Sequence, residues 1–498
     1  MERISIIENF FPKNDPALLQ KAEDNLPTLL ETELVPVSFA APTLAPGETV
    51  RWDFGTHCVG YLTLQLSFSG SHPDAPALLR LRFAERLEEF MEDASAYHGW
   101  ISKGWIAEEL LHVDRLPFTV SLPRRYAFRY LECTVIDTSR KFRLVVDRVW
   151  VRAVSAVDPT RVTPLERTDP KLCRIDAVAI KTLAECMQEV FEDGPKRDRR
   201  LWLGDFRLQA LVNGVTFRNY ALVKRCLYLF AGTRFPDDRI SACLFTDGEP
   251  AADDTWFSDY ALLYPVALAE YLALTDDSEA LRDLYDVAVA QLDRALAMTD
   301  ADGIVNADFV DAAFIDWSPG LEKTASTMGV LLYALPYGRV LAQKNGDALR
   351  DAIYAEALER GRAAAKTRFW DPAKGVFVSN GQISPASQIW MTLGGVLPEA
   401  SAKGALCRLL SEPSETPLVA PYLHHYALEA LLSVGKTDAA MEHLLSYWGG
   451  MVDRGADTFW EIWNPEAPDA SPYGGTIVNS YCHAWSCTPS YFLRNHLL

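Results

Sequence analysis

Residues 192–205 carry side chains that can do acid–base chemistry. They read EDGPKRDRRLWLGD, with four carboxylates, three arginines, one lysine and one tryptophan in fourteen positions. Gly194 and Pro195 should break the preceding helical pattern, because proline lacks an N–H group and glycine accepts positive φ. We therefore expect the acids on a loop at a helix end, where functional groups concentrate. Arginines beside carboxylates shift their pKa values, which favours a polar site over a salt-bridged connection between helices.

A second group, residues 455–463, reads GADTFWEIW and places Glu461 between two tryptophans. Indole rings offer flat faces for stacking, and they raise the pKa of a carboxyl by desolvation, whereas a nearby arginine would lower it. The alternative interpretation is a buried glutamate paired with a local cation. The sequence leaves both open.

Two further groups combine polar residues with aromatic ones. Residues 480–487 read SYCHAWSC at the predicted start of the last helix, where His483 is either a substrate-binding residue or a hydrogen-bonded core histidine. Acids also lie beside tryptophan at 253–259 and at 314–317, and capping of a helix by aspartate explains at least one of these.

These groups favour one chemistry over others. The sequence shows no glycine-rich phosphate loop, no Ser–His–Asp order and no metal-ligand spacing, so we predict neither a metal at the site nor a cofactor. The sequence leaves open whether a metal supports the N-terminal domain. Separated carboxylates among tryptophans indicate glycoside hydrolysis. In that reaction one acid protonates the leaving oxygen while a second carboxylate activates water or attacks carbon.

The first 160 residues should form the β part of the chain. Short alternating runs separated by turn residues predict an antiparallel β-sandwich. The predicted strands are Thr49–Phe54, Gly60–Phe68, Leu78–Phe83, Phe118–Ser121, Tyr130–Asp137 and Phe142–Ala153. Residues 93–109 interrupt the pattern with three aromatic residues, Tyr97, Trp100 and Trp105, and are interpreted as a loop that reaches toward the other domain.

From about Asp169 the apolar period becomes helical. About eleven helices are predicted, at 170–192, 204–232, 256–274, 278–299, 322–344, 347–368, 385–396, 398–412, 421–435, 437–449 and 477–494. Helices arranged as hairpins in this number favour a closed (α/α)6 barrel. An open solenoid is the rival, although no fixed repeat is evident. The long connections 193–205, 245–257, 303–320, 370–384 and 451–476 should then line one mouth.

Composition limits the location and the partners. The 498 residues carry a formal charge of −19, which argues against nucleic acid as a partner. Nine cysteines without a C-x-x-C pair indicate free thiols in a reducing compartment. Residues 1–11 do not resemble a signal peptide, and no apolar run is long enough to span a membrane. We therefore predict a cytoplasmic protein with a small carbohydrate substrate, and the sequence leaves its oligomeric state open.

With these motifs in place, the chain resembles the α-L-rhamnosidases of glycoside hydrolase family 78, which are six-hairpin glycosidases. The family pattern D-x-P-x-R-E-x-x-x-W-x-G-D resembles residues 193–205, and G-A-x-T-x-W-E-x-W resembles residues 455–463. The pattern S-x-x-H near the end of the barrel is similar to residues 480–483. The resemblance covers the helical part, and the β-rich part fits the N-terminal sandwich of the family. It implies a sandwich domain over 1–160 and a catalytic barrel over 161–498.

The resemblance also implies an inverting mechanism, with Asp198 as the general acid and Glu461 as the general base. The carboxyls should then stand about 6.5–9.5 Å apart to admit a water. The predicted substrate-binding residues are Asp193, Arg197, Trp202, Asp205, Trp256, Asp259, Asp316, Trp317, Trp460 and His483.

The chain departs from the family pattern at the acid, which is usually Glu and here is the shorter Asp198. Either the backbone approaches the substrate more closely, or the aglycone differs, or another group such as Glu192 donates the proton. Because the chain ends at Leu498, the C-terminal β domain of larger relatives is expected to be absent, and small glycosides are the expected substrates. The predicted reaction releases a terminal α-L-rhamnosyl residue. The alternatives are another six-hairpin glycosidase, acting on a different deoxy sugar or a uronide, and a barrel that binds sugar without catalysis.

Overall fold

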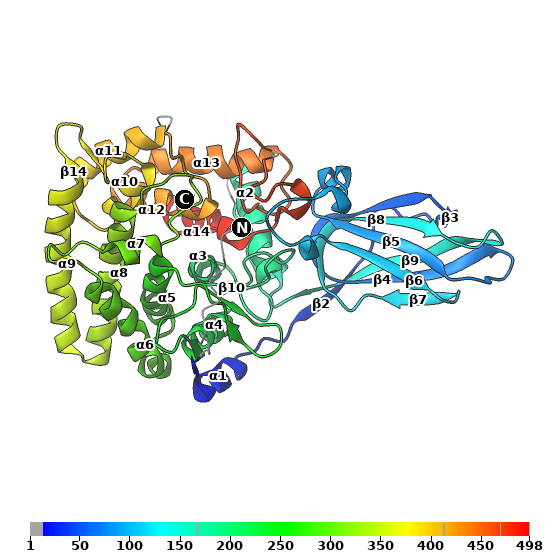
Figure 1. Ribbon diagram of the computed structural model, residues 1–498, viewed down its shortest axis with the longest axis horizontal. Coiled ribbons are helices and arrows are strands. Elements are labelled where there is room, and N and C mark those ends of the chain that lie inside the picture. Colours follow the sequence, from blue (N-terminus) through cyan, green and yellow to red (C-terminus); the bar gives the residue numbers. More distant parts are fainter. Residues whose placement is uncertain (1–12, 167–168, 412–413, 469, 498) are drawn as a thin grey trace.

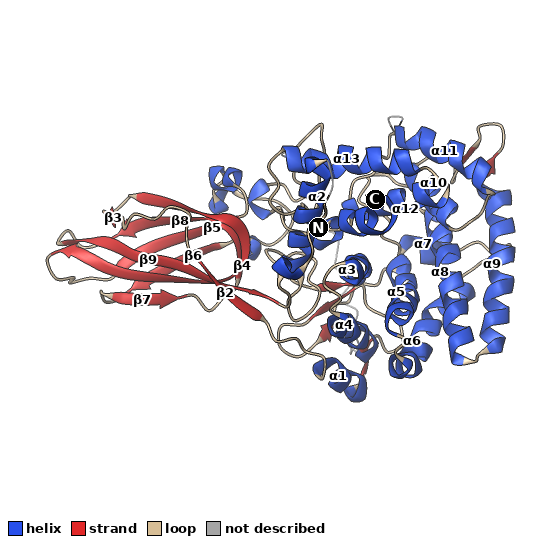
Figure 2. Ribbon diagram, turned by 180° about the vertical axis from the view of Figure 1, so that it is seen from behind, coloured by secondary structure: helices blue, strands red, loops and turns tan. Residues whose placement is uncertain are grey.

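The chain consists of a β-rich N-terminal region and a helical C-terminal region that lie side by side (Figures 1 and 2). The computed structural model describes residues 13–166, 169–411, 414–468 and 470–497. The predicted mixture of β and α structure is therefore confirmed. The prediction made for residues 1–11 lies outside the described residues.

One antiparallel sheet of eight strands forms the β-rich region, in the order β2-β9-β4-β8-β5-β6, with β3 on β9 and β7 on β4. The strands are β2 (Leu30–Leu34), β3 (Thr43–Leu44), β4 (Thr49–Gly70), β5 (Ala77–Ala84), β6 (Glu108–Val113), β7 (Phe118–Ser121), β8 (Tyr126–Asp137) and β9 (Phe142–Ser155). Strand β1 (Lys13–Asn14) lies outside this sheet and pairs with β11 (Thr233–Arg234) of the helical region.

Strand β4 links the two halves of this sheet. Its first half pairs with β8 and its second half, from Gly60 onward, pairs with β9. The prediction divided this stretch into two strands. The register shifts between Asp53 and Cys58, and Gly55 adopts φ +77 there, so the interruption read from the sequence is a bulge within one strand.

The two-residue period of β4 explains how the sheet encloses its core. Leu62, Leu64 and Leu66 are fully buried, whereas Thr63 and Gln65 between them are more exposed. Alternation of this kind identified most of the strands from the sequence. Strand β2 was missed because its sequence, LETEL, has no buried face and gives no alternating signal.

The helical region is built mainly from helix pairs. Its principal helices are α2 (Pro170–Cys186), α3 (Leu203–Val215), α4 (Tyr220–Gly232), α5 (Ser258–Thr275), α6 (Ser278–Ala297), α8 (Thr324–Asn345), α9 (Ala348–Phe369), α10 (Pro385–Leu393), α11 (Glu399–Ser411), α12 (Pro421–Ser433) and α13 (Thr437–Asp453), with short α7 (Ala307–Asp311) and α14 (Pro489–Phe492). Helix α3 packs against α5, α5 against α8, α8 against α10, and α10 against α12. Helices α5, α8, α10 and α12 also pack against the next helix in the chain, which is α6, α9, α11 and α13 respectively.

Burial distinguishes an inner helix such as α5 from an outer helix such as α9. In α5, 14 of the 18 residues are buried, so the helix is surrounded by protein on all sides. In α9, only five of the 22 residues are buried, at intervals of three or four: Tyr354, Leu358, Gly361, Ala365 and Phe369. Such a single stripe covers a core from one side, which places α5 inside and α9 outside.

The structure corrects three predicted helices. The predicted helix 204–232 is two helices, because Arg218 takes φ +56 and Asn213 accepts a hydrogen bond from the Asn219 backbone at the break. The predicted helix 170–192 ends at Cys186. The predicted helix 477–494 is broken into short helical turns, at Thr476–Val478, Ala484–Ser486 and 489–497, with non-helical residues between them.

The last of these corrections affects the site directly. Backbone groups of residues 480–483 bond to residues 459–461 instead of to one another, with Glu461 N–H donating to Ser480 O (3.0 Å) and His483 N–H donating to Phe459 O (2.9 Å). The segment therefore cannot be helical, and this pairing brings His483 beside Glu461.

An N-terminal helix, α1 (Pro16–Glu23), was not predicted. Asp15 caps it, accepting from the backbone N–H groups of Ala17 and Leu18. It packs against α4, so this segment lies on the helical region although it precedes the sheet in the chain.

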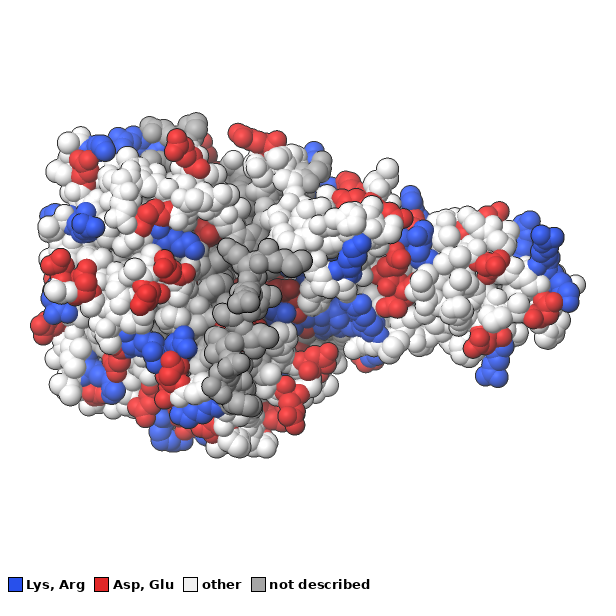
Figure 3. All heavy atoms as spheres, in the orientation of Figure 1, with Lys and Arg blue, Asp and Glu red and all other residues white. Residues whose placement is uncertain are grey.

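Acidic and basic side chains are interspersed on the face drawn in Figure 3. Among the described residues, no helix combines the length and the apolar character that a membrane crossing requires.

The close packing of α8 on α10 gives a stability prediction. A Cβ on Gly329 of α8 would stand 2.5 Å from the carbonyl carbon of Trp390 in α10, so Gly329→Ala must push the two backbones apart. We expect a loss of about 1–3 kcal/mol in the free energy of unfolding, measured by urea denaturation.

Gly404→Ala in α11 is the matched control. Nothing lies within 4 Å of its added Cβ. Since alanine is favoured over glycine within a helix, this variant should gain about 0.5–1 kcal/mol. Equal effects of the two substitutions would contradict the close approach of α8 and α10.

Candidate active site

A cavity of about 120 Å³ lies between the 193–202 turn, the start of α3 and the 459–485 segment. Eight of the twelve predicted site residues line it: Asp193, Arg197, Asp198, Trp202, Asp205, Trp317, Glu461 and His483. Residues far apart in the chain therefore meet in one polar pocket with aromatic walls.

The turn that carries the acids is closed by its own backbone. Asp193 N–H donates to Arg200 O (3.0 Å), and Arg200 N–H donates to the Asp193 carboxylate (3.0 Å). Within the turn, Arg199 N–H donates to Arg197 O (2.9 Å) across Asp198, which takes φ +65. A γ-turn of this hand is rare and strained, and such conformations persist where the surroundings fix them.

Gly194 acts through its small size. Its φ is not positive, contrary to the expectation for this helix-breaking position. An added Cβ would stand 2.8 Å from Ser480 Oγ, so glycine allows the turn to approach the 480–483 segment closely.

Charged residues of the β-rich region fix the turn from outside. The Lys196 ammonium donates to the Glu89 carboxylate and to Asn479 O (2.8 Å). Arg125 binds Glu192 (2.5 Å). These pairs are buried, so they anchor the turn on the side away from the cavity.

Glu192 is thereby excluded as a lining group of the cavity. The Glu192 carboxylate is bound to Arg125, and Glu192 is not among the described residues that line the cavity. Asp198, by contrast, lines the cavity.

Arg197 joins the two candidate catalytic carboxylates. One guanidinium nitrogen donates to Glu461, and another lies 3.6 Å from Asp198. Its Nε donates to Val478 O (3.1 Å), and its guanidinium carbon lies 4.1 Å from the centre of the Tyr473 ring. Burial raises the pKa of Asp198, whereas Arg197, Arg200 and a hydrogen bond from the Trp202 side chain lower it.

Glu461 is held at both oxygens and through its backbone. The Tyr473 hydroxyl donates to Oε1 (2.6 Å), while Arg197 occupies Oε2. The Trp485 indole donates to the Glu461 carbonyl (2.9 Å). The orientation of this carboxylate is therefore fixed.

His483 faces the remaining acids. Its ring nitrogens lie 3.8 Å from Asp193 and 3.6 Å from Asp205, and the ring contacts Trp485 at 4.5 Å. Burial and the charge of Arg197 lower the pKa of His483, so the imidazole is neutral. Burial raises the pKa of Asp205, and burial together with the charges of Asp198 and Asp205 raises the pKa of Asp193.

Exposure distinguishes the four carboxylates of the cavity. The side chains of Asp193, Asp205 and Glu461 are 4%, 3% and 6% exposed, whereas that of Asp198 is 22% exposed. Asp198 therefore lies at the mouth and the other three lie deeper. A ligand that spans them has a polar end inside and an outer end beside Asp198.

Four predicted residues lie outside the cavity wall. Asp259 accepts from the backbone N–H groups of Phe314 and Ile315 (both 2.9 Å), so it holds the loop that supplies Phe314 and Trp317 to the cavity. Asp316 accepts from the backbone N–H groups of Val419 (2.8 Å) and Ala420 (2.9 Å), which precede α12, so it binds a distant segment and does not cap a helix of its own in the way that the capping interpretation expected. Burial raises the pKa of Asp316 to about 6.

The other two are tryptophans. Trp256 packs edge-to-face on Phe309. Trp460 faces away from the cavity, and the Arg86 guanidinium lies 4.6 Å from its ring centre. The resemblance implied that both tryptophans complete the substrate subsite, and neither is among the described residues that line the cavity.

Five residues of the cavity wall were not predicted: Phe257, Tyr260, Phe314, Tyr473 and Trp485. Trp485, Phe257 and Phe314 lie within sequence groups that drew attention for their acids or for His483. Tyr473 gave no local signal, because its role depends on a hydrogen bond to a residue in another part of the loop.

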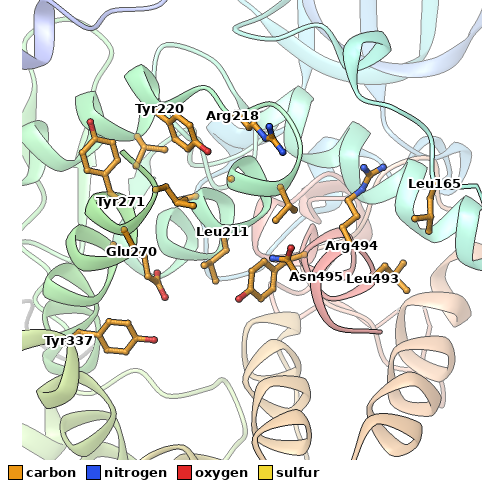
Figure 4. Close-up of a pocket in the computed structure, with 18 residues that line it drawn as sticks. Leu165, Leu211, Arg218, Tyr220, Glu270, Tyr271, Tyr337, Leu493, Arg494 and Asn495 are labelled. Carbon is orange, nitrogen blue, oxygen red and sulfur yellow. The ribbon is translucent and has the colours of Figure 1, made fainter. Parts of the chain in front are cut away.

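A larger cavity, of about 790 Å³, lies at the opposite end of α3 and α5 (Figure 4). The Glu270 carboxylate and the Tyr337 hydroxyl point into it. However, Arg207 donates to both oxygens of Glu270 (3.2 and 2.7 Å), and no second carboxylate lines this cavity among the described residues. Of these two cavities, the smaller one is therefore the one whose described lining holds a pair of carboxylates.

Comparison with known proteins gives two family matches. The model for the glycosyl hydrolase family 78 alpha-rhamnosidase N-terminal domain matches residues 31–153. The model for the bacterial alpha-L-rhamnosidase 6 hairpin glycosidase domain matches residues 161–497.

Comparisons with individual proteins also give rhamnosidases. A solved rhamnosidase from Klebsiella oxytoca with rhamnose bound is 42% identical, with a TM-score of 0.94, over 98% of this chain and 100% of that one. A family 78 rhamnosidase from Bacillus sp. GL1 is 21% identical and shares the fold (TM-score 0.78; 92% of this chain, 48% of that one). An alpha-L-rhamnosidase from Streptomyces avermitilis is 25% identical over 86% of this chain, which spans 40% of the length of that relative.

The guanidinium of Arg197, which contacts both Asp198 and Glu461, gives a stability prediction. Arg197→Met leaves the buried Glu461 carboxylate without its cation, so the free energy of unfolding should fall by about 3–5 kcal/mol in urea denaturation. Adding Glu461→Gln to this variant should recover part of the loss, because no buried charge then lacks a partner.

Arg148→Met is the matched control, since Arg148 pairs with Glu33 on the surface, where both side chains are about half exposed. It should cost no more than about 1 kcal/mol. If the double variant loses the sum of the two single losses, Arg197 and Glu461 are not coupled.

Proposed function

The chain belongs to glycoside hydrolase family 78, and we propose that it hydrolyses a terminal α-L-rhamnosyl residue from small glycosides with inversion at the anomeric carbon. The observation that carries the proposal is the pair of carboxylates, Asp198 and Glu461, on one guanidinium in a single cavity. The rhamnose bound to the Klebsiella oxytoca relative supports the choice of sugar.

In the proposed mechanism Glu461 is the general base. It accepts a proton from a water molecule, whose oxygen attacks the anomeric carbon from the face opposite the leaving group. The bond between that carbon and the leaving oxygen breaks as the new bond forms. Arg197 and Tyr473 fix the two oxygens of Glu461, which orients the base before the substrate arrives.

Asp198 is the proposed general acid, and it donates its proton to the leaving oxygen. Burial, which raises its pKa, favours the protonated form that an acid requires. Its place at the mouth allows the leaving group to extend outward. Asp193, Asp205 and the neutral His483 then hold the sugar hydroxyls at the deep end.

The strained turn supports the assignment of the shorter acid. The positive φ of Asp198 turns the backbone through a γ-turn at the cavity wall. We infer that this brings the main chain close enough to replace the missing methylene. Of the three explanations for aspartate at this position, closer approach of the backbone is thus favoured.

Packing supports a closed barrel as the proposed scaffold. Helices α3, α5, α8, α10 and α12 contact one another in sequence, and α14 contacts α3, so a ring is complete if α14 occupies the last inner position. We propose an (α/α)6 barrel over residues 161–498 and a sandwich formed by the two halves of the sheet within 1–160. Seven buried cysteines carry free thiols, which supports the proposed reducing, cytoplasmic location. They are Cys58, Cys133, Cys186, Cys226, Cys243, Cys482 and Cys487.

Glu461→Gln tests the base. It removes the proton acceptor and keeps the shape, so hydrolysis of an aryl α-L-rhamnoside should fall by roughly 10²–10⁴-fold while L-rhamnose binding, measured by calorimetry, is largely retained. Unchanged hydrolysis would remove Glu461 from the mechanism.

The same substrate gives the stereochemistry. In the wild-type protein, NMR during the first turnovers should show β-L-rhamnose as the initial product. Initial release of the α anomer would contradict inversion, and no release from any of a panel of aryl glycosides would favour the sugar-binding alternative.

Asp198→Asn tests the acid. A nitrophenolate leaves without protonation, whereas a sugar alcohol does not, so kcat/KM should fall much more for a rhamnosyl disaccharide than for nitrophenyl α-L-rhamnoside. In the wild-type protein, activity should fall as the pH rises through the pKa of Asp198, and this limb should be absent in the variant. Equal losses with both substrates would assign proton donation to another group.

A further inference from the structure

We propose that Trp100, supplied by the β-rich region, is a stacking platform for the leaving group of the substrate, and that it selects leaving groups that carry a ring. The inference rests on the proposed hydrolysis and names a specificity-determining residue outside the helical region. Its basis is the position, exposure and fixation of the Trp100 indole.

Trp100 lies on a segment that reaches from the sheet to the helical region, as predicted for residues 93–109. The Tyr97 hydroxyl donates to Tyr473 O (2.8 Å), and the Trp100 indole N–H donates to Pro472 O (2.8 Å). A Cβ on Gly99 would stand 1.8 Å from Tyr473 O, so the two backbones are in direct contact. The segment is therefore fastened to the loop that carries Tyr473.

The Trp100 side chain is fixed without being buried. It is 75% exposed, yet its indole N–H is bonded and its ring lies 5.4 Å from that of Tyr473 at 40°. Fixing a side chain costs conformational entropy, which burial of apolar surface usually offsets. Here most of the ring face stays in water, so the fixed indole is available for a ligand.

Tyr473 connects Trp100 to the reacting groups. The ring of Tyr473 lies against the guanidinium of Arg197 at 4.1 Å, and Arg197 in turn lies 3.6 Å from Asp198. Trp317, which lines the cavity, contacts the same tyrosine ring at 5.8 Å. Trp100 is thus one aromatic ring removed from the cavity, on the side of the Arg197–Asp198 pair.

The exposure of the carboxylates gives the direction of the substrate. The leaving oxygen must lie beside Asp198, the most exposed of the four acids, because that residue protonates it. The rest of the leaving group therefore passes outward over the rim. A ring that leaves the cavity on the Tyr473 side meets the free face of Trp100, and stacking of a phenyl or pyranose ring on indole is favourable.

The test compares leaving groups with and without a ring. For Trp100→Ala we expect kcat/KM to fall roughly threefold to tenfold for aryl α-L-rhamnosides and rhamnosyl disaccharides, as for the loss of one aromatic contact. The fall should be much smaller for α-L-rhamnosyl fluoride, whose leaving group has no ring, and inhibition by L-rhamnose should be unaltered. Trp100→Phe should restore much of the loss for the ring-bearing substrates.

Trp150→Ala is the matched control, since Trp150 lies in β9 and is paired with Thr63, away from the cavity. Trp150→Ala should leave kcat/KM unchanged for the aryl rhamnoside, the disaccharide and the fluoride, and it should leave inhibition by L-rhamnose unchanged. The two ring-bearing substrates separate the sources of the ring: a loss confined to the aryl glycoside indicates an aromatic aglycone, and a loss confined to the disaccharide indicates a sugar.

Three outcomes would overturn the proposal. An equal loss with the fluoride would show that Trp100 acts on the catalytic groups through Tyr473. No loss with either ring-bearing substrate would show that the indole does not contact the leaving group, and a changed mass in light scattering would make it a contact between copies of the chain. If the wild-type protein hydrolyses no rhamnoside at all, the proposed function itself fails, which the wild-type measurements show separately.

Discussion

A single buried cation holds the candidate site together. Four carboxylates line a cavity of about 120 Å³, and the guanidinium of Arg197 lies against two of them. Removing carboxylates from water is costly unless they are paired or protonated. Arg197 compensates Asp198 and Glu461, and burial raises the pKa values of Asp193, Asp205 and Asp198. The proposed acid and the proposed base therefore share one cation.

The position of Arg197 depends in turn on the β-rich region. Lys196, the preceding residue, is bound by Glu89, whose pKa burial raises to about 7 against the opposing charge of that lysine. Glu192 is bound by Arg125 of the same region. Buried ion pairs contribute little net stability, but breaking one is costly, so they fix geometry. The β-rich region therefore supports the turn that carries Arg197 and Asp198.

The sequence predicted site residues that lie in clusters of acids and tryptophans along the chain. It missed residues whose place in the site depends on contacts outside such clusters. The spacing of acids and tryptophans identified Asp198, Glu461 and His483, which line one cavity. Tyr473 was missed because its hydroxyl reaches Glu461 across a loop that has no periodic pattern. The helix predicted over 477–494 was wrong for a related reason: its backbone groups bond to residues 459–461, and sequence periodicity does not report such pairing.

The backbone at position 198 accounts for the residue found there. A positive φ is unfavourable for most side chains, but aspartate tolerates it better than glutamate, because its short polar group bonds locally. Asp198 lies at φ +65 and the next residue at φ +52. A glutamate there would meet greater strain and carry its carboxyl one methylene further from a main chain already turned into the cavity wall. The positive φ at position 198 and the short side chain of aspartate therefore depend on each other, and we expect neither to change without the other.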